Sequence, residues 1–349
     1  FKICLGTQTL SGAQIQDLKT RVLRAIEEPR KASIAGSIQE LDIRPHYIQA
    51  LVENSRAHMG TRRLKVVVDA GNGVGGMVGP QVLKDLGLEV IELYCEPDGR
   101  FPNHHPDPTV LENIKDLVAK VRESGADFGV GWDGDADRIG AVDENGRVIF
   151  GDMLLLIYGR EILRSNPGAT IIGDVKCSSL LFDDLRSRGA DAIMWKTGHS
   201  LIKAKLRETG GDLAGEMSGH IFFKHRYYGF DDALYATARL AEILSKSDKS
   251  ASQLLADLPP VFSTPEIRFD CPENLKFRIP EEIKNAFSGY QVDTTDGARI
   301  KFENGWGLVR ASNTQPVLVL RFEAASQDEL REYQKLVTGK LEEIMSGLS

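Results

Sequence analysis

The sequence predicts an α/β protein made of consecutive α/β domains that end in a smaller α+β domain. Its 349 residues exceed what one hydrophobic core usually holds, which favours two or three domains. Between residues 64 and 245, short stretches rich in β-branched residues alternate with longer stretches of helical periodicity, as in largely parallel sheets. After Pro259 and Pro260 several strands follow one another before a final helix, which indicates an α+β unit.

The first 41 residues have the pattern of a domain's end. Phe1 to Leu5 is typical of a short strand, and Ser11 to Glu28 carries apolar residues at helical spacing. Residues 29–41 are polar and break the periodicity, so we interpret them as a linker. A lone strand and helix cannot bury their own apolar faces, so we expect a preceding domain to cover them.

The next stretch reads as an α/β unit in which strands and helices alternate. Its predicted strands lie near residues 64–69, 88–94, 126–131 and 139–142, and its helices near 79–86 and 111–123. A second such unit starts near Gly151. It has predicted helices near 152–164, 178–187, 199–208 and 231–245, and strands near 169–173, 191–195, 212–215 and 220–224.

The last unit has five predicted strands and one C-terminal helix. The strands lie near residues 265–270, 290–293, 298–302, 306–311 and 317–324. Ser326 and Glu329 have the spacing of a capping box, which predicts that the helix begins there.

Composition and charge exclude several classes of protein. A net charge of −7 provides no general basic field for nucleic acid or a membrane surface. No apolar run approaches the roughly 18 residues of a membrane span. The four cysteines include no C-x-x-C pair, which argues against a zinc site or a disulfide scaffold. This cysteine pattern fits a reducing compartment, so we expect a cytoplasmic protein.

The strongest chemical signal is Asp133-Gly-Asp-Ala-Asp-Arg138. Three carboxylates at alternate positions of a short loop can converge on one hard cation, and oxygen ligands favour Mg²⁺ or Ca²⁺ over zinc. Mg²⁺ leaves coordination positions open for phosphate, and Arg138 adds a fixed positive charge. The sequence therefore predicts a metal site at Asp133, Asp135 and Asp137.

Two other interpretations of this loop are weaker. An EF-hand would place ligands at the three aspartates and Glu144, but it needs glycine where Arg138 stands and helices where strands are predicted. A solvated acidic turn would leave three aspartates repelling one another without a cation.

Several basic and sugar-binding candidates follow predicted strands. Lys176 and His199 stand at strand ends, where open α/β sheets place ligands, so they can reach one cleft. Lysine suits a phosphate, and histidine suits proton transfer near neutral pH. Glu216 and Ser218 can bond sugar hydroxyls, and His220 adds a titratable group. Each of these alone is equally compatible with a surface charge, a capping group or a structural turn.

A second anion site is predicted between two apolar strands. Arg310-Ala-Ser-Asn-Thr314 offers a guanidinium, two hydroxyls, an amide and several backbone N–H groups within five residues. A polar hairpin loop is the alternative interpretation.

Together these segments resemble the α-D-phosphohexomutase family. Asp133–Arg138, Gly215–His220 and Arg310–Thr314 match its motifs in order and spacing. Pro102–Pro106 and Trp195–His199 bring the chain closer to the bacterial phosphomannomutase/phosphoglucomutase group. The resemblance covers essentially the whole chain.

The resemblance implies four domains with mixed sheets around a central cleft, the last of them a TBP-like sheet that binds no nucleic acid. Residues 1–41 would be the end of the first domain and the linker. The following domains would be 42–148 with the metal-binding loop, 149–259 with the sugar-binding loop, and 260–349 with the phosphate-binding loop.

The resemblance also implies roles for the candidate residues. Mg²⁺ would be held by Asp133, Asp135, Asp137 and a phosphoserine. Arg138, Lys176 and His220 would lie at the reacting end of the substrate. The remaining substrate contacts would be those to the sugar and to the phosphate that is not transferred: His199, Glu216, Ser218, His220, Arg310, Ser312, Asn313 and Thr314.

One departure affects the chemistry. The family's phosphoserine lies in a first-domain loop, and no Thr-Ala-Ser-His-Asn-Pro stretch occurs in this sequence. Neither His199-Ser200 nor Ser218-Gly-His220 replaces it. We therefore expect the nucleophile in an N-terminal domain missing from this chain, and the chain alone to be inactive.

The implied reaction interconverts hexose 1-phosphate and hexose 6-phosphate, of glucose, mannose or both. It passes through a phosphoserine and a 1,6-bisphosphate, with glucose 1,6-bisphosphate as activator. The general acid and base stay open among Lys176, His199 and His220. Two alternatives remain: a phosphatase that forms a phosphoaspartate, and a catalytically silent binder of sugar phosphates.

Overall fold

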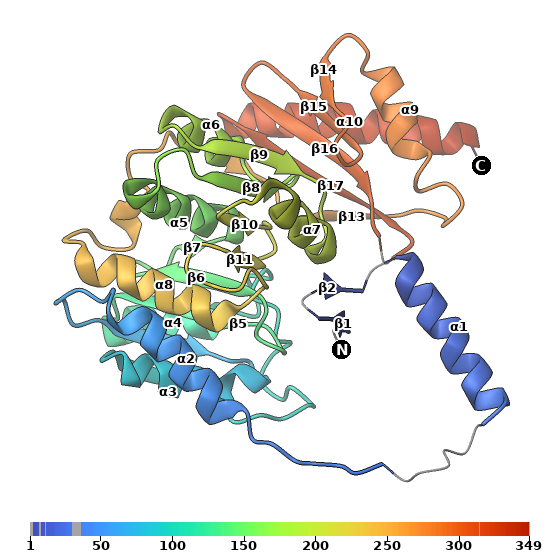
Figure 1. Cartoon of the computed structure of the whole chain (residues 1–349). Helices are drawn as coiled ribbons and strands as arrows, with labels where there is room; N and C mark the ends of the chain where they lie inside the picture. The colour runs from blue at the N-terminus through green and yellow to red at the C-terminus, as the bar shows by residue number, and fades with distance from the viewer. Residues whose placement is uncertain (1–2, 7, 11, 30–35, 314, 349) are drawn as a thin grey trace. The chain divides into compact units, whose positions relative to one another are not determined.

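The computed structural model describes residues 3–6, 8–10, 12–29, 36–313 and 315–348 (Figure 1). The chain forms two compact units, residues 1–47 and residues 48–349. In the first unit, strands β1 (Cys4–Leu5) and β2 (Gln8–Thr9) pair antiparallel, and helix α1 (Ala13–Glu27) follows. The expected helix is present. The start of the expected strand lies outside the described residues, and β2 was not expected.

Helix α2 (Arg44–Arg56) was also not expected from the sequence. Its Pro45 lies in the first turn, where a proline removes no intrahelical hydrogen bond. Only Leu51, Val52 and Ser55 of this helix are buried, so its apolar periodicity is weak.

The first sheet of the larger unit is mixed, with strand order β4-β3-β5-β6-β7. Strands β3, β4 and β5 run parallel, whereas β5, β6 and β7 are joined antiparallel. The elements are β3 (Lys65–Asp69), η1 (Val74–Met77), α3 (Gly79–Asp85), β4 (Glu89–Leu93), α4 (Lys115–Ser124), β5 (Phe128–Trp132), β6 (Ile139–Asp143) and β7 (Val148–Ile149). The helix expected near 111–123 begins later than predicted, because residues 109–114 form turns.

The second sheet is also mixed, with strand order β11-β10-β8-β9 and β11 antiparallel to the rest. Its elements are α5 (Gly151–Ser165), β8 (Thr170–Asp174), α6 (Ser179–Ser187), β9 (Asp191–Trp195), α7 (His199–Thr209), β10 (Leu213–Gly215), β11 (Ile221–Phe223) and α8 (Ala233–Lys246). Side chains alternate between the two faces of a strand. Ile172 therefore packs with Ile202 and Leu206 of α7, while Gly159 of α5 approaches Ile171 on the other face.

Helix α8 is buried on every side from Ala233 to Ser245. It contacts α5 and β11 of the second sheet and also α3 and β6 of the first. Its Thr237 accepts a hydrogen bond from the Trp132 indole at 3.0 Å. Helix α8 thus joins the cores of the two α/β layers.

The C-terminal sheet is antiparallel, with strand order β12-β17-β16-β15-β14 and β13 also paired to β17. After η2 (Ser252–Leu254), this last unit contains β12 (Phe262–Ser263), β13 (Ile267–Asp270), α9 (Ile279–Ala286), β14 (Gln291–Asp293), β15 (Ala298–Lys301), β16 (Gly305–Ala311), β17 (Val317–Ala324) and α10 (Gln327–Leu348). The prediction of a single helix here was wrong, because α9 precedes α10. The capping box is confirmed: Ser326 Oγ donates to Glu329 Oε2 at 2.7 Å and accepts from its N–H at 3.2 Å.

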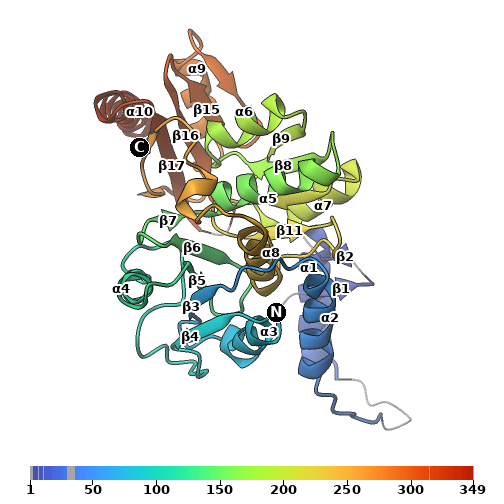
Figure 2. The same cartoon turned by 90° about the vertical axis from the view of Figure 1, so that its left-hand side faces the viewer.

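Along strands β15, β16 and β17, successive side chains point to opposite faces of the sheet, so apolar side chains lie on one face and arginines on the other. Ile300, Val309 and Leu320 pack with helices α9 and α10, and Figure 2 shows α10 on the side away from β8 and β9. The opposite face carries Trp306 and Leu308, which pack against Val175 and Met194 of the second α/β layer. On that same face lie three buried arginines: Arg299, Arg310 and Arg321.

No helix among the described residues is both long and apolar enough to cross a membrane.

Candidate functional site

The loop of three aspartates joins β5 to β6, and strands rather than helices flank it. Asp133 is buried, and its carboxylate fixes the loop by accepting from the N–H groups of Asp137 at 3.0 Å and Arg138 at 2.9 Å. Ala136 has a left-handed φ of 58°, which turns the chain back toward β6. The Glu144 carboxylate instead accepts hydrogen bonds from Ser250 and Ser252, which argues against the EF-hand interpretation.

The three aspartates lie close enough to share one cation. One carboxylate oxygen of each lies within 4.8 Å of the others. Burial, with Asp137 beside it, raises the pKa of Asp133 to about 6, although Arg138 opposes the shift. The Arg138 Nε donates to Asp133 at 2.8 Å, and its Nη1 lies 3.2 Å from Asp107. A set of carboxylate oxygens that repel one another fits a hard divalent cation such as Mg²⁺.

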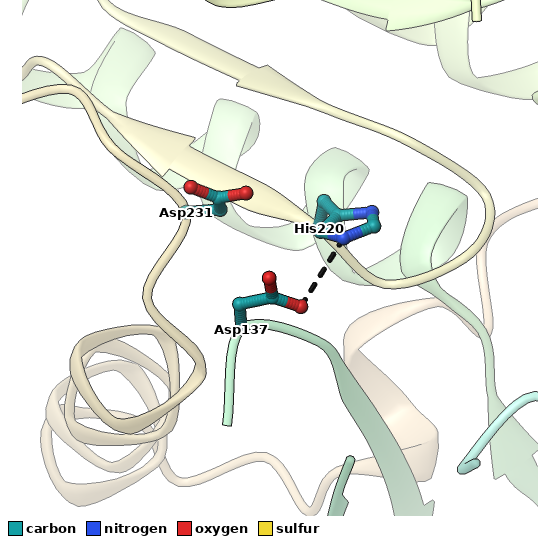
Figure 3. A group of neighbouring side chains, drawn as sticks. All are labelled: Asp137, His220 and Asp231. Atoms are coloured by element: carbon teal, nitrogen blue, oxygen red, sulfur yellow. Dashed lines mark ion pairs between the residues drawn. The ribbon is translucent and has the colours of Figure 1, made fainter. Parts of the chain in front are cut away.

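The loop before β11 lies directly against the aspartate loop. The Ile139 N–H donates to the Gly219 carbonyl at 3.1 Å, and Arg138 and His220 form an isolated β-bridge. The His220 Nε2 lies 3.2 Å from Asp137, as Figure 3 shows. These contacts join predicted metal ligands to predicted sugar-binding residues that lie about 80 positions further along the chain.

His220 is held from both sides by carboxylates. Its Nδ1 lies 2.8 Å from Glu216, and the Ser218 hydroxyl lies 3.2 Å from the same nitrogen. Burial alone would lower the pKa of His220, but Asp137 and Glu216 outweigh it and raise the pKa to about 9. Burial alone would raise the pKa of Glu216, but His220 and Lys176 outweigh it and lower the pKa to about 2.

His199 is brought to the same place by the start of helix α7. Its ring centroid lies 6.1 Å from that of His220. The preceding Gly198 has φ 134°, and its N–H donates to the Glu216 carboxylate. Glu216 therefore fixes His220 and the first turn of α7 together.

Lys176 follows β8 and is buried, with 5% of its surface exposed. Its ammonium lies 2.7 Å from Glu266 and 3.8 Å from Asp174. Asp174 is fully buried and also accepts from the Thr197 hydroxyl at 2.9 Å, so it ties the loops after β8 and β9 together. The sequence predicted that Lys176 and His199 can reach one cleft, but it gave no sign of Glu266, the partner of Lys176.

The predicted phosphate loop meets the loop that precedes α7. The Arg310 Nε donates to Asp296 at 2.9 Å, and Asp296 also accepts from the Thr197 N–H at 3.0 Å. Asn313 donates to the Thr197 carbonyl at 3.2 Å. The buried Nη2 of Arg310 has no hydrogen-bond partner among the described residues.

The other members of that loop are placed differently. Ser312 is buried, and its hydroxyl accepts from the Gln315 N–H at 3.2 Å. Thr314 lies outside the described residues. Arg321 of the neighbouring strand β17 donates to the Lys176 carbonyl and to Asp152.

The candidate residues thus form one continuous series of contacts within residues 48–349. It runs from the aspartate loop through His220 and Glu216 to Gly198, and from Thr197 to Arg310. Three carboxylates that hold this series together were not predicted as site residues: Asp174, Glu266 and Asp296. Asp174 stands next to the Val-Lys176 pair, but the other two stand alone in the sequence and carry no local signal.

Comparison with known proteins adds independent information. Three family profiles match consecutive parts of the chain: phosphoglucomutase/phosphomannomutase alpha/beta/alpha domain II at residues 45–146, domain III at 150–262, and the C-terminal domain at 266–340. A phosphomannomutase/phosphoglucomutase from Pseudomonas aeruginosa is 46% identical over 350 aligned residues, which cover all of this chain and 74% of the relative.

Solved structures agree with this similarity. A phosphoglucomutase/phosphomannomutase family protein from Burkholderia thailandensis superposes with a TM-score of 0.84 at 44% identity, covering 94% of this chain and 71% of that one. The N-acetylphosphoglucosamine mutase of Aspergillus fumigatus, in complex with GlcNAc-6P and magnesium, has a TM-score of 0.63 at 19% identity. That match covers 84% of this chain and 64% of the other, and it shows the shared fold alone.

Proposed function

Because the chain belongs to the phosphoglucomutase/phosphomannomutase family, we propose that it acts in the interconversion of hexose 1-phosphate and hexose 6-phosphate. The substrates would be phosphates of glucose, mannose or both, as the name of the Pseudomonas relative suggests. The reaction would use a phosphoserine that these 349 residues do not supply and would pass through a 1,6-bisphosphate, with glucose 1,6-bisphosphate as activator.

The observation that carries the proposal is that one series of contacting residues has a group suited to an anion at each of its two ends. At one end, three carboxylates and Arg138 suit a metal-bound phosphoryl group. At the other end, the buried Arg310 guanidinium has an Nη2 without a partner among the described residues, which suits a second phosphate. A hexose with a phosphate at either end fits two such sites, and a phosphatase acting on one phosphate needs only one.

We assign Mg²⁺ to Asp133, Asp135 and Asp137, whose three carboxylates are the oxygen donors that this ion prefers. When bound, the ion would offset negative charge on the phosphoryl group. The magnesium in the Aspergillus complex supports this assignment at the level of the fold.

The remaining assignments concern the chain's own side chains. Arg138 and Lys176 would hold the transferring phosphoryl, because Arg138 brings a half-buried positive charge to Asp133 and Lys176 brings a buried one beside Asp174. Glu216, Ser218, His199 and His220 would bond the sugar hydroxyls.

At the other end of the substrate, Arg310, Ser312, Asn313 and Thr314 would bind the phosphate that is not reacting. Proton transfer at the sugar oxygen would fall to Lys176, His199 or His220.

We further propose domain limits of 42–148, 149–259 and 260–349, with residues 1–41 as the end of a preceding domain and linker. A cytoplasmic location fits the free thiols of Cys95, Cys177 and Cys271.

The test measures glucose 1-phosphate conversion to glucose 6-phosphate, with Mg²⁺ and trace glucose 1,6-bisphosphate. The chain is assayed alone and with the N-terminal quarter of the Pseudomonas relative fused to it. We expect turnover only in the fusion. Arg310→Met should raise KM at least about tenfold, whereas the matched exposed change Arg278→Met should not.

Three results would contradict the proposal. Turnover by the purified chain alone would place a nucleophile within it. A phosphorylated aspartate, released by hydroxylamine, would favour the phosphatase. Hexose phosphate binding without turnover by a folded fusion would favour the silent binder.

A further inference from the structure

His220 also belongs to a second group of candidate metal ligands. One ligand atom each of Asp137, His220 and Asp231 lies within 4.8 Å of the other two. Figure 3 shows Asp137 and His220 facing each other, with Asp231 beside them. Asp137 is the only residue that this group shares with the aspartate loop, and the group differs from the loop in offering an imidazole nitrogen.

The surroundings of His220 are those of a metal-binding histidine. Such histidines usually give one ring nitrogen to the metal and the other to a carboxylate, which fixes the ring. Here Glu216 holds Nδ1 at 2.8 Å, so Nε2 is directed at Asp137, 3.2 Å away. The ligand atoms of a tetrahedral zinc ion, with bonds of about 2.0–2.1 Å, are about 3.3 Å apart. The Nε2-to-carboxylate distance therefore already matches one edge of a zinc site.

The charge of the group suits a divalent ion. Asp231 is buried and its Oδ1 lies 3.2 Å from the Lys203 ammonium. When a metal ion replaces a proton of the His220 ring, three carboxylates (Asp137, Glu216 and Asp231) and the Lys203 ammonium leave two negative charges around it. A divalent cation would neutralise these two charges.

We propose that Asp137, His220 and Asp231 form a second cation site, for Zn²⁺ or a similar transition-metal ion. Imidazole together with carboxylate is the donor set of such ions, whereas Mg²⁺ prefers oxygen alone. Because Asp137 belongs to both sites, the two ions compete for it. Under the proposed function, this site would make the protein sensitive to zinc, since it withdraws Asp137 from the magnesium site and His220 from the substrate.

The experiment measures Zn²⁺ and Mg²⁺ binding to the purified chain by calorimetry, and Co²⁺ binding by visible absorption. Asp231→Asn alters the second site only, and Asp135→Asn is the matched change in the aspartate loop only. We expect Asp231→Asn to weaken Zn²⁺ binding at least about tenfold and leave Mg²⁺ unchanged, and Asp135→Asn to do the reverse. Millimolar Mg²⁺ should weaken Zn²⁺ binding to the unmodified chain, and the intense bands of tetrahedral Co²⁺ should be lost in Asp231→Asn.

Because Asp231 is buried beside Lys203, His220→Gln serves as a second variant if Asp231→Asn fails to fold. It too should weaken Zn²⁺ binding and spare Mg²⁺. Equal Zn²⁺ affinity in the unmodified chain and the second-site variant would overturn the proposal. So would a greater loss of Zn²⁺ binding in Asp135→Asn, since zinc would then occupy the aspartate loop. These readouts do not depend on catalysis, so the proposed function can fail separately.

Discussion

The ion pair between Lys176 and Glu266 provides a direct test of how the site is held together. Glu266 stands just before β13, and its Oε2 lies 2.7 Å from the Lys176 ammonium. The next carboxylate, Asp174, is 3.8 Å away. We consider Glu266→Gln, which keeps the size of the side chain and a hydrogen-bond acceptor but removes the charge.

The expected cost follows from the burial of the two partners. Breaking a buried ion pair by removing one partner typically costs about 3–5 kcal/mol. Only 6% of the Lys176 side chain is exposed, but 26% of Glu266 is, and glutamine still accepts a hydrogen bond. We therefore expect a loss of about 2 kcal/mol in the free energy of unfolding at pH 7.

Urea unfolding followed by tryptophan fluorescence measures this loss, with Glu282→Gln as the matched control. Glu282 forms an ion pair with Arg278 at 3.2 Å in the same domain, but their side chains are 37% and 57% exposed. An exposed pair of this kind contributes at most about 0.5 kcal/mol. When Lys176 is first replaced by Met, adding Glu266→Gln should lower the free energy of unfolding by less than half as much as it does in the unmodified chain. The reason is that no buried cation is then left without its partner.

The pH dependence gives a second readout. Burial alone would raise the pKa of Glu266, but Lys176 outweighs it and the pKa lies below 4.5 in the folded chain. A lowered pKa contributes stability that is complete above the unfolded value and disappears as pH falls through the folded one. The difference in the free energy of unfolding between the unmodified chain and Glu266→Gln should stay constant from pH 7 to about 5. It should disappear as the pH falls below 4.5. A cost no larger than that of Glu282→Gln would refute the reasoning.

Three further predictions concern the framework and are checked by chemical unfolding of purified variants. Gly60→Ala should cost at least about 2 kcal/mol, since an added Cβ would lie 2.1 Å from the Ser245 carbonyl oxygen of α8, whereas Gly99→Ala, with nothing within 4 Å, should be neutral. Ser326→Ala should cost about 1 kcal/mol through loss of the capping box, and no change would contradict it. Trp132→Phe should cost about 2 kcal/mol, because it removes a buried indole that donates to a threonine of α8 at 3.0 Å.

The sequence predicted those elements whose apolar pattern is strong. Strands such as β3 and β17, and helices such as α5 and α10, were found close to their predicted places. Helices α2 and α9 were not predicted, and α9 spans only eight residues, a length at which a helical period is hard to establish. The apolar periodicity of α8 also does not predict that this helix packs on both α/β layers, because that depends on how the two layers are arranged in the fold.

The candidate site could be predicted where several charged or polar side chains stand within a few positions of one another in the sequence. Asp133 to Arg138 and Arg310 to Asn313 stand at strand ends, and their composition alone indicates a cation and an anion. Glu266 and Asp296 were not predictable, because each acquires its role from a partner on another element. A single carboxylate in a loop is far more often a solvated surface group, so only the folded chain distinguishes these two.

These two carboxylates also explain how the chain keeps the two cations that we propose bind anions, Lys176 and Arg310, buried. Removing a lysine or arginine from water costs several kcal/mol unless a partner compensates, and Glu266 and Asp296 compensate for Lys176 and Arg310. Carboxylate and phosphate oxygens present similar acceptors to a cation. A phosphate arriving at Arg310 can thus take Nη2, which has no partner in the described part of the chain, while Asp296 keeps Nε, so the guanidinium need not move. At Lys176, in contrast, a phosphate must share the ammonium with Glu266, so charge removal there should strengthen phosphate binding while it weakens the fold.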